Sequence, residues 1–163
     1  MKTIELHNYN IIFDDTFKSL ERFLNSKSYS KKIVLVDENT KEHCLPLLSE
    51  QIKIDVIIEI KWGEANKNIE TCELIWKSLI DNTIDRNAVF INLGGGVIGD
   101  MGGFAASCYK RGIDFIQIPT TVLSQVDSSI GGKLGIDFKY GKNLIGLFQN
   151  PKLVYINKQF LKT

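Results

Sequence analysis

The chain has 163 residues, a length typical of a single domain. Hydrophobic residues make up 44% of it and charged residues 24%, which excludes a disordered or low-complexity chain. The net charge of +1 excludes a strong overall attraction to nucleic acid or to a membrane surface, and no apolar run approaches the roughly 18 residues of a membrane span.

Strand and helix patterns alternate along the chain. Asp14 or Asp15 is placed to cap the first helix, and Pro46 should shorten or kink the second. The predicted strands lie at 2–7, 10–13, 31–39, 55–60, 87–93, 114–119 and 152–157. The predicted helices lie at 14–25, 40–51, 68–79, in the second part of 94–112, and at 120–129.

The segment between the last predicted helix and the last predicted strand is less regular. Residues 133–140 are interpreted as a hairpin or loop and residues 141–148 as a helical turn. The alternation as a whole predicts the α/β class, with a Rossmann-like parallel sheet covered by helices on both faces.

The cysteines and the first residues bear on the compartment. Cys44, Cys72 and Cys108 are widely spaced and odd in number, which favours reduced thiols rather than a disulfide framework. The opening residues contain neither an apolar core nor a cleavage motif of a signal peptide. We therefore expect a cytoplasmic protein.

Glycine and charge are unevenly distributed. Twelve of the 13 glycines lie between Gly94 and Gly146, and residues 94–163 carry eight basic but only four acidic side chains. Glycine lets the backbone approach a ligand closely, and excess lysine favours an anionic one. The alternative is that these glycines serve only turns and tight packing.

The sequence GGGVIG at 94–99 is the strongest local motif. It follows a predicted strand and opens a predicted helix, where free backbone N–H groups and the helix dipole favour a pyrophosphate. It departs from the usual dinucleotide fingerprint, because it follows a late strand and the next strand ends in Pro119 rather than in an acid.

Several charged residues near this motif have two interpretations. Asp37 ends an earlier strand and is either a ribose ligand or a helix cap. Asp100 either benefits from the helix dipole or contacts a hydroxyl group or a cation. Lys110 suits the end of that helix, whereas Arg111 could grip a phosphate with its planar guanidinium. His7 and His43 are interpreted as surface or packing residues.

Longer motifs connect the second half to a known family. The order GGGVIGD, IPTT, LSQVD, GGK and GKNLIG, together with GEANK at 63–67, closely resembles the 3-dehydroquinate synthase family of sugar-phosphate cyclases. The resemblance implies an N-terminal NAD-binding domain and a C-terminal helical domain that holds zinc or cobalt. It implies a homodimer that releases phosphate from 3-deoxy-D-arabino-heptulosonate 7-phosphate, in the cleft between the domains.

The family's chains are about twice as long as this one, so we expect residues 1–163 to be the NAD-binding domain of a two-domain enzyme, without the metal-binding domain. After residue 73 the chain contains neither Glu nor His, so no metal site is predicted in its second half. The reaction needs a tightly held cofactor, lysines for an anionic substrate, a metal and a base, of which this chain can supply the first two.

The resemblance also assigns residues. Cofactor contacts are expected from Asp37, Asn39, Trp62, Gly63, Glu64, Ala65, Asn66, Lys67, Gly95, Gly96, Val97, Ile98, Gly99, Asp100, Thr120, Thr121, Lys133, Lys142, Phe160, Leu161, Lys162 and Thr163. The catalytic candidates are Asp127, Lys133 and Asn143, with Arg111 added for its guanidinium. Trp62 could instead be a packing aromatic, and the two threonines also suit a helix cap.

Two other functions stay open at this level. The chain could be the corresponding domain of another sugar-phosphate cyclase, or of a glycerol or iron-type alcohol dehydrogenase. It could also be a nucleotide-binding module without catalysis.

Overall fold

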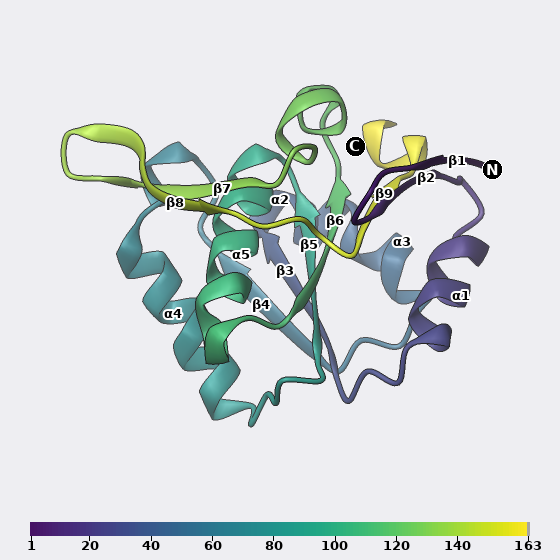
Figure 1. The fold of residues 1–163 in the computed structure, drawn as a ribbon, viewed down its shortest axis with the longest axis horizontal. Coiled ribbons are helices and arrows are strands. Elements are labelled where there is room, and N and C mark those ends of the chain that lie inside the picture. Colours follow the sequence, from purple (N-terminus) through teal and green to yellow (C-terminus); the bar gives the residue numbers. More distant parts are fainter. Residues whose placement is uncertain (163) are drawn as a thin grey trace.

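The computed structural model describes residues 1–162, and its centre is one seven-stranded sheet in the order β1-β2-β9-β6-β5-β3-β4 (Figure 1). All neighbours in it are parallel except β1 and β2. Its strands are β1 (Lys2–Glu5), β2 (Asn10–Phe13), β3 (Lys32–Asp37), β4 (Val56–Ile60), β5 (Val89–Gly94), β6 (Asp114–Pro119) and β9 (Leu153–Ile156). The predicted parallel sheet is confirmed.

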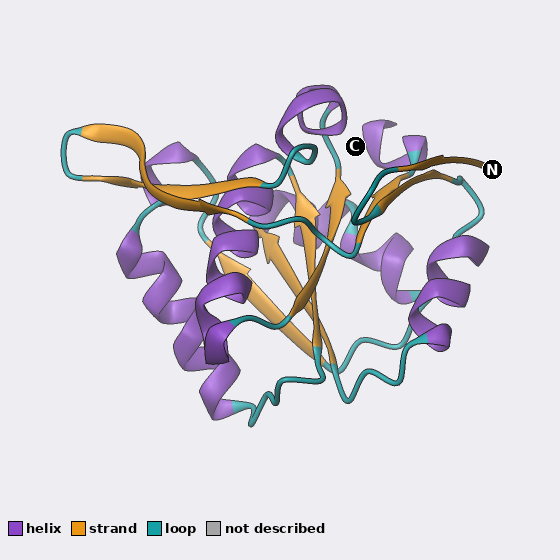
Figure 2. Ribbon diagram, viewed as in Figure 1, coloured by secondary structure: helices purple, strands orange, loops and turns teal. Residues whose placement is uncertain are grey.

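Helices cover both faces of this sheet, as predicted (Figure 2). One face carries α4 (Ile69–Asp81) and α5 (Gly96–Cys108), packed on alternate residues of β3, β4 and β5. The other carries α1 (Lys18–Ser26), α2 (Glu38–His43) and α3 (Leu45–Ser49). Successive residues of β3 and β5 pack alternately against the helices on one face of the sheet and those on the other. Both strands are therefore buried on both sides, which explains their nearly continuous apolar runs.

Shorter helical segments complete the fold. Pro46 stands in the first turn of α3, so the predicted helix at 40–51 is divided into α2 and α3. The predicted helix at 120–129 contains a π-helical segment, Ser124–Ser128. Single 3₁₀ turns occupy Glu64–Asn66, Tyr109–Arg111 and Lys158–Lys162.

The prediction of a helical turn at 141–148 is wrong. Strand β8 (Gly141–Phe148) pairs antiparallel with β7 (Lys133–Phe138), and this hairpin lies across α5 (Figure 1). Ile145 and Leu147 pack against the core while their neighbours face outward, so the segment has the two-residue period of a strand. A Cβ on Gly146 would lie 2.2 Å from the carbonyl oxygen of Leu134, so glycine permits the close strand contact.

Asp14 anchors the start of α1 through four hydrogen bonds. Its two carboxylate oxygens accept the backbone N–H groups of Thr16 and Ser19, both at 2.9 Å, and both hydroxyls, at 2.6 Å. Burial alone would raise the pKa of Asp14, but these hydrogen bonds outweigh it and hold the pKa well below its ordinary value. Of the two candidate caps, Asp14 therefore fixes this helix start.

We expect Asp14→Ala to lower the free energy of unfolding by about 1–2 kcal/mol at pH 7, the range of a lost helix cap. Because the folded pKa of Asp14 lies below its unfolded value, this stabilisation is present above about pH 4 and is lost as the pH falls further. Urea unfolding at several pH values measures it. The exposed acid Glu21 in the same helix is the control. A wild-type advantage that persists undiminished well below pH 4 would contradict the role of the ionised carboxylate.

Candidate functional site

The carboxyl ends of the parallel strands surround a cavity of about 360 Å³. The chain leaves β3 for β4 on one side and returns to β5 on the other, so the strand order reverses between β3 and β5. Open α/β sheets bind ligands at such a switch point. The lining residues of this first cavity are Asp37, Asn39, Thr40, His43, Cys44, Trp62, Gly63, Glu64, Gly95, Gly96, Val97, Ile98, Thr120 and Thr121.

The glycine turn between β5 and α5 forms one wall of the first cavity. Gly95 precedes α5 in extended conformation and has no capping side chain, so the first N–H groups of a 13-residue helix face the cavity end of the sheet. A Cβ on Gly96 would lie 3.2 Å from Ser128 Oγ, which lines a second cavity. The turn therefore provides unpaired donors, as an anionic group requires.

Other glycines of the same helix serve packing. Gly99 faces Gln117, whose Nε2 donates to the Gly99 carbonyl at 3.0 Å, and it lines neither cavity. A Cβ on Gly102 would lie 2.1 Å from Asn92 Oδ1, and one on Gly103 would lie 2.4 Å from the Leu134 side chain. The packing interpretation therefore holds for Gly99, Gly102 and Gly103, whereas Gly95 and Gly96 line the first cavity and stay candidates for ligand contact.

The polar residues at the ends of β3 and β6 cap helices and also line the first cavity. Asp37 Oδ1 accepts the backbone N–H of Thr40 at 2.8 Å and its hydroxyl at 3.0 Å, which leaves Oδ2 outside both bonds. Thr121 Oγ1 and Ser124 Oγ lie 2.8 Å apart at the next helix start. Capping and ligand contact are compatible in both places, because the cap fixes the side chain at the cavity edge.

The loop after β4 contributes three residues to the first cavity. Trp62 is 66% exposed and lines the first cavity with Gly63 and Glu64, so it is not a core aromatic. Asn66 Nδ2 donates to the Trp62 carbonyl at 2.8 Å and stabilises the turn. Ala65, in the same turn, lines neither cavity.

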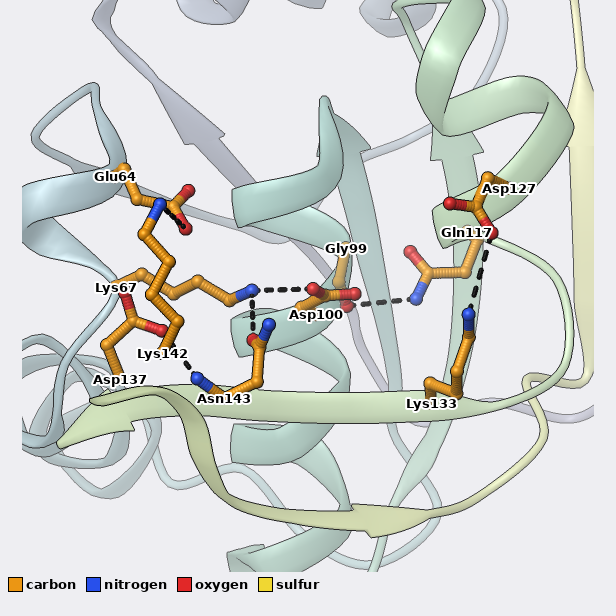
Figure 3. A network of polar contacts seen from close by, with 10 residues as sticks. All are labelled: Glu64, Lys67, Gly99, Asp100, Gln117, Asp127, Lys133, Asp137, Lys142 and Asn143. Carbon is orange, nitrogen blue, oxygen red and sulfur yellow. Dashed lines mark hydrogen bonds and ion pairs between the residues drawn. The ribbon is translucent and has the colours of Figure 1, made fainter.

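Lys67 ends this loop and is the centre of a polar cluster (Figure 3). Its side chain is 5% exposed, and Nζ lies 2.6 Å from Asp100 Oδ2 and 2.7 Å from Asn143 Oδ1. Burial raises the pKa of Asp100, and the Lys67 ammonium opposes that rise. Asp100 therefore has a buried cationic partner and is more than a residue favoured by the helix dipole.

Asp100 and Asn143 of this cluster also line a second cavity, of about 470 Å³. Its lining residues are Asp100, Asp127, Ser128, Lys133, Leu134, Gly135, Asn143, Leu144, Gly146, Leu147 and Phe148. Lys133 Nζ lies 3.5 Å from Asp127 Oδ1. Lys142 lines neither cavity, and its Nζ lies 3.5 Å from Oε1 of Glu64, which lines the first cavity. All four of these side chains are at least 45% exposed, so each lysine can exchange its weak ion pair for an anionic ligand.

The structure brings most of the predicted site residues together but separates a few. Arg111 is exposed beyond the C-terminal end of α5, about 20 Å along the helix from the glycine turn, and lines neither cavity. This position does not fit the predicted catalytic role of Arg111 at the site that this chain forms. Phe160 is fully buried, with its ring 5.8 Å from that of Phe17, and is a core residue.

The other residues near the last turn add little to the site. Leu161 is 39% exposed and lines neither cavity. The Lys162 side chain and all of Thr163 lie outside the described part of the chain.

Sequence reasoning missed several lining residues. Leu144, Gly146, Leu147 and Phe148 of β8 line the second cavity, and the helical interpretation of this segment gave no reason to include them. His43, interpreted as a surface or packing residue, lines the first cavity. Ser128 adjoins Asp127 in the same short helix and could have been included with it.

Residues 1–162 contain no group of three or more His, Cys, Asp or Glu side chains arranged to hold a metal ion. No helix in that range has the length and hydropathy to cross a membrane.

Comparison with known proteins gives a consistent result. Residues 57–163 match the model of the 3-dehydroquinate synthase N-terminal family. The chain belongs to this family. It is 48% identical to the 3-dehydroquinate synthase of Sulfurovum sp. (strain NBC37-1), over 98% of this chain and 46% of that protein. The chain spans about half the length of the curated relatives that it matches.

Solved structures of related cyclases share the fold. One is 2-deoxy-scyllo-inosose synthase complexed with carbaglucose-6-phosphate, NAD⁺ and Co²⁺, with TM-score 0.90 and 26% identity over 98% of this chain and 46% of that one. Another is ValA, the 2-epi-5-epi-valiolone synthase of Streptomyces hygroscopicus subsp. jinggangensis 5008, with NAD⁺ and Zn²⁺ bound. Its TM-score is 0.85 and its identity 25%, over 100% of this chain and 46% of that one.

Proposed function

We propose that this chain is the NAD-binding half of a 3-dehydroquinate synthase, which converts 3-deoxy-D-arabino-heptulosonate 7-phosphate into 3-dehydroquinate and phosphate. One observation carries the proposal. Asp100 and Asn143 of the Lys67–Asp100–Asn143 cluster line the second cavity with Lys133, and Asp100 stands one helical turn after Gly96, which lines the first cavity. Sequence identity of 48% to a 3-dehydroquinate synthase, against 26% to 2-deoxy-scyllo-inosose synthase, favours this reaction over the other cyclases.

The residues around the first cavity fit the cofactor. Gly95 and Gly96 leave room beside the unpaired N–H groups of α5, where a pyrophosphate would lie. Asp37 at the end of β3 would accept a hydroxyl of the adenosine ribose, and Asp100 with Lys67 would hold the second ribose. The dinucleotide would thus pass the glycine turn and extend from the first cavity into the second.

The second cavity suits an anionic sugar. Lys133 and Lys142 would neutralise its phosphate and carboxylate groups, and Asn143 would hydrogen-bond a hydroxyl. Asp127 keeps Lys133 at the cavity edge until the substrate replaces it. The bound cofactor supplies reversible hydride transfer, so the overall reaction needs no external oxidant.

Residues 1–162 do not fit the divalent metal that the cyclase neighbours contain, so we derive no step through it. We assign zinc or cobalt to a second, helical domain that completes the cleft, in a cytoplasmic homodimer. The chain by itself would then lack turnover. A nucleotide-binding module without catalysis is the alternative, and it would bind NAD but gain no activity from that second domain.

The test is calorimetry on this chain with NAD, ADP-ribose and nicotinamide mononucleotide. We expect NAD to bind about 10–1,000-fold more weakly than to the two-domain enzyme, because solvent competes for contacts where the second wall of the cleft is missing. ADP-ribose should bind nearly as well as NAD. Phosphate release from the heptulosonate phosphate should not be detectable with NAD and zinc present.

Three results would overturn parts of the proposal. Turnover by this chain alone would contradict the assignment of the metal to a second domain. Binding of the mononucleotide without ADP-ribose would reverse the placement of the two ends of the cofactor. A folded chain that binds neither NAD nor ADP-ribose at millimolar concentration would contradict its role as an independent cofactor-binding half.

A further inference from the structure

Asp137 lies in an irregular part of the β7–β8 hairpin, away from both cavities. The strand register shifts between Ile136 and Phe138, so the single residue Asp137 faces the segment 142–144 of β8. Such bulges interrupt the ladder and redirect side chains. Within this one, Asn143 has a left-handed backbone with φ of 53°, a conformation that is uncommon outside glycine but that asparagine adopts more readily than most residues.

The Asp137 carboxylate stabilises that unusual conformation. Its Oδ1 accepts the backbone N–H of Asn143 at 2.8 Å, a donor that the interrupted ladder leaves without a strand partner (Figure 3). A hydrogen bond from a backbone N–H to an ionised carboxylate is stronger than one between neutral groups. The bond therefore fixes the direction in which the Asn143 side chain leaves the strand.

Asp137 also holds the other partner of that side chain. Its backbone N–H donates to the Lys67 carbonyl at 2.8 Å, and Lys67 Nζ donates to Asn143 Oδ1 at 2.7 Å. The three residues form a closed ring of hydrogen bonds that joins the hairpin to the loop before α4. Asp100 lies outside the ring but receives the same ammonium at 2.6 Å.

We infer that Asp137 is a positioning residue for the candidate site, because it sets the Asn143 amide and, through it, the Lys67 ammonium beside Asp100. The inference rests on the proposed function, in which Lys67 and Asp100 hold the second ribose of NAD. Asp137 itself lines neither cavity. Neither the glycine motif nor the second cavity gives a reason to expect an acid at position 137, so this role of Asp137 adds to the proposed function.

The first measurement is hydrogen exchange at the backbone N–H of Asn143, followed by NMR on this chain. Asp137→Ala removes the acceptor, and exchange should become at least tenfold faster. Asp137→Asn keeps a side-chain oxygen and the backbone donor, and should stay within about threefold of wild type. Tyr140→Ala, at the fully exposed hairpin tip, controls for general loosening of the hairpin. This measurement needs no ligand, so it tests the ring even if NAD does not bind.

The second measurement is the affinity for NAD compared with ADP, which lacks the second ribose. Asp137→Ala should weaken NAD binding about tenfold and leave ADP binding unchanged, and Asp137→Asn should restore most of the loss. Asn143→Gly removes the amide while it tolerates the positive φ, and Asp137→Ala should add nothing in that background. Equal loss of NAD and ADP affinity, or additive effects of the two substitutions, would show a merely structural role and overturn the inference.

If the wild-type chain binds ADP as tightly as NAD, the second ribose adds nothing to the affinity and the proposed placement of the cofactor fails. Slow exchange at the backbone N–H of Asn143 would still support the ring of hydrogen bonds. If exchange at Asn143 is unchanged in a folded Asp137→Ala variant, the ring is wrong whatever the chain binds.

Discussion

Gly102→Ala is expected to destabilise the fold by about 2–3 kcal/mol, although alanine is the better helix former. The added methyl group would lie 2.1 Å from Asn92 Oδ1 and 2.7 Å from Leu35 Cδ2, in a fully buried contact between α5 and the sheet. Helix propensity favours alanine by about 1 kcal/mol, so the clash must exceed that gain. Urea unfolding followed by circular dichroism measures the difference.

Asn92 provides the matched control. Its amide atoms are buried and have no hydrogen-bond partner within residues 1–162, so Asn92→Ala breaks no hydrogen bond in this part of the protein. In the Gly102→Ala background it removes the nearest clashing atom and should restore a large part of the lost stability. If Gly102→Ala is as stable as wild type, helix propensity dominates, and α5 does not need a glycine there to approach the sheet.

The parallel sheet and the turn after β5 were predictable because their signals are local. Buried strands such as β3 and β5 show as short apolar runs, and the glycine turn stands between a strand and a helix in a single continuous segment. What local signals could not show is which glycine lines a cavity and which faces the sheet. Gly96 lies opposite Ser128, whereas Gly102 lies opposite Asn92 in β5 and Leu35 in β3. These neighbours are distant in the sequence, so a local motif cannot show them.

The hairpin shows the limit of periodicity. In β8 only Ile145 and Leu147 point to the core, and two glycines dilute the alternation, so the segment resembles a helical turn when considered alone. Its strand conformation follows from pairing with β7, a tertiary contact that overrides the weak local preference.

Most of the individual site residues were predicted, but their arrangement was not. Lys67, Asp100 and Asn143 lie in three segments that meet only because the hairpin folds across α5 (Figure 3). The sequence shows a lysine, an acid and an amide, each with an ordinary alternative. Only their contact distinguishes a buried ion pair from three independent surface groups. Asp137, which carries no motif of its own, could not have been selected without that contact.

The ion pair of this cluster gives the second large prediction. Lys67→Met is expected to lower the free energy of unfolding by about 2–4 kcal/mol at pH 7, because it leaves the Asp100 carboxylate in a largely buried place without its cation. The Lys67 side chain is 5% exposed and that of Asp100 is 20% exposed, so the expected loss is somewhat below that of a fully buried pair.

The pH dependence identifies the cause of that loss. Burial holds the pKa of Asp100 above its unfolded value, and removal of the opposing Lys67 ammonium should raise it further. A group whose folded pKa is raised favours the folded state at low pH, and this advantage is lost as the pH rises above its unfolded value of about 4. Lys67→Met should therefore recover stability relative to wild type as the pH falls from 7 toward 4.

Asp100→Asn supplies the control for the charge. It keeps the shape of the side chain but removes the group that needs a cation, so adding it to Lys67→Met should restore part of the stability at pH 7 and abolish the recovery at low pH. A pH-independent loss in Lys67→Met, unchanged by Asp100→Asn, would mean that packing of the lysine stem stabilises the fold. The ion pair beside the second cavity would then serve ligand geometry without contributing to the stability of the chain.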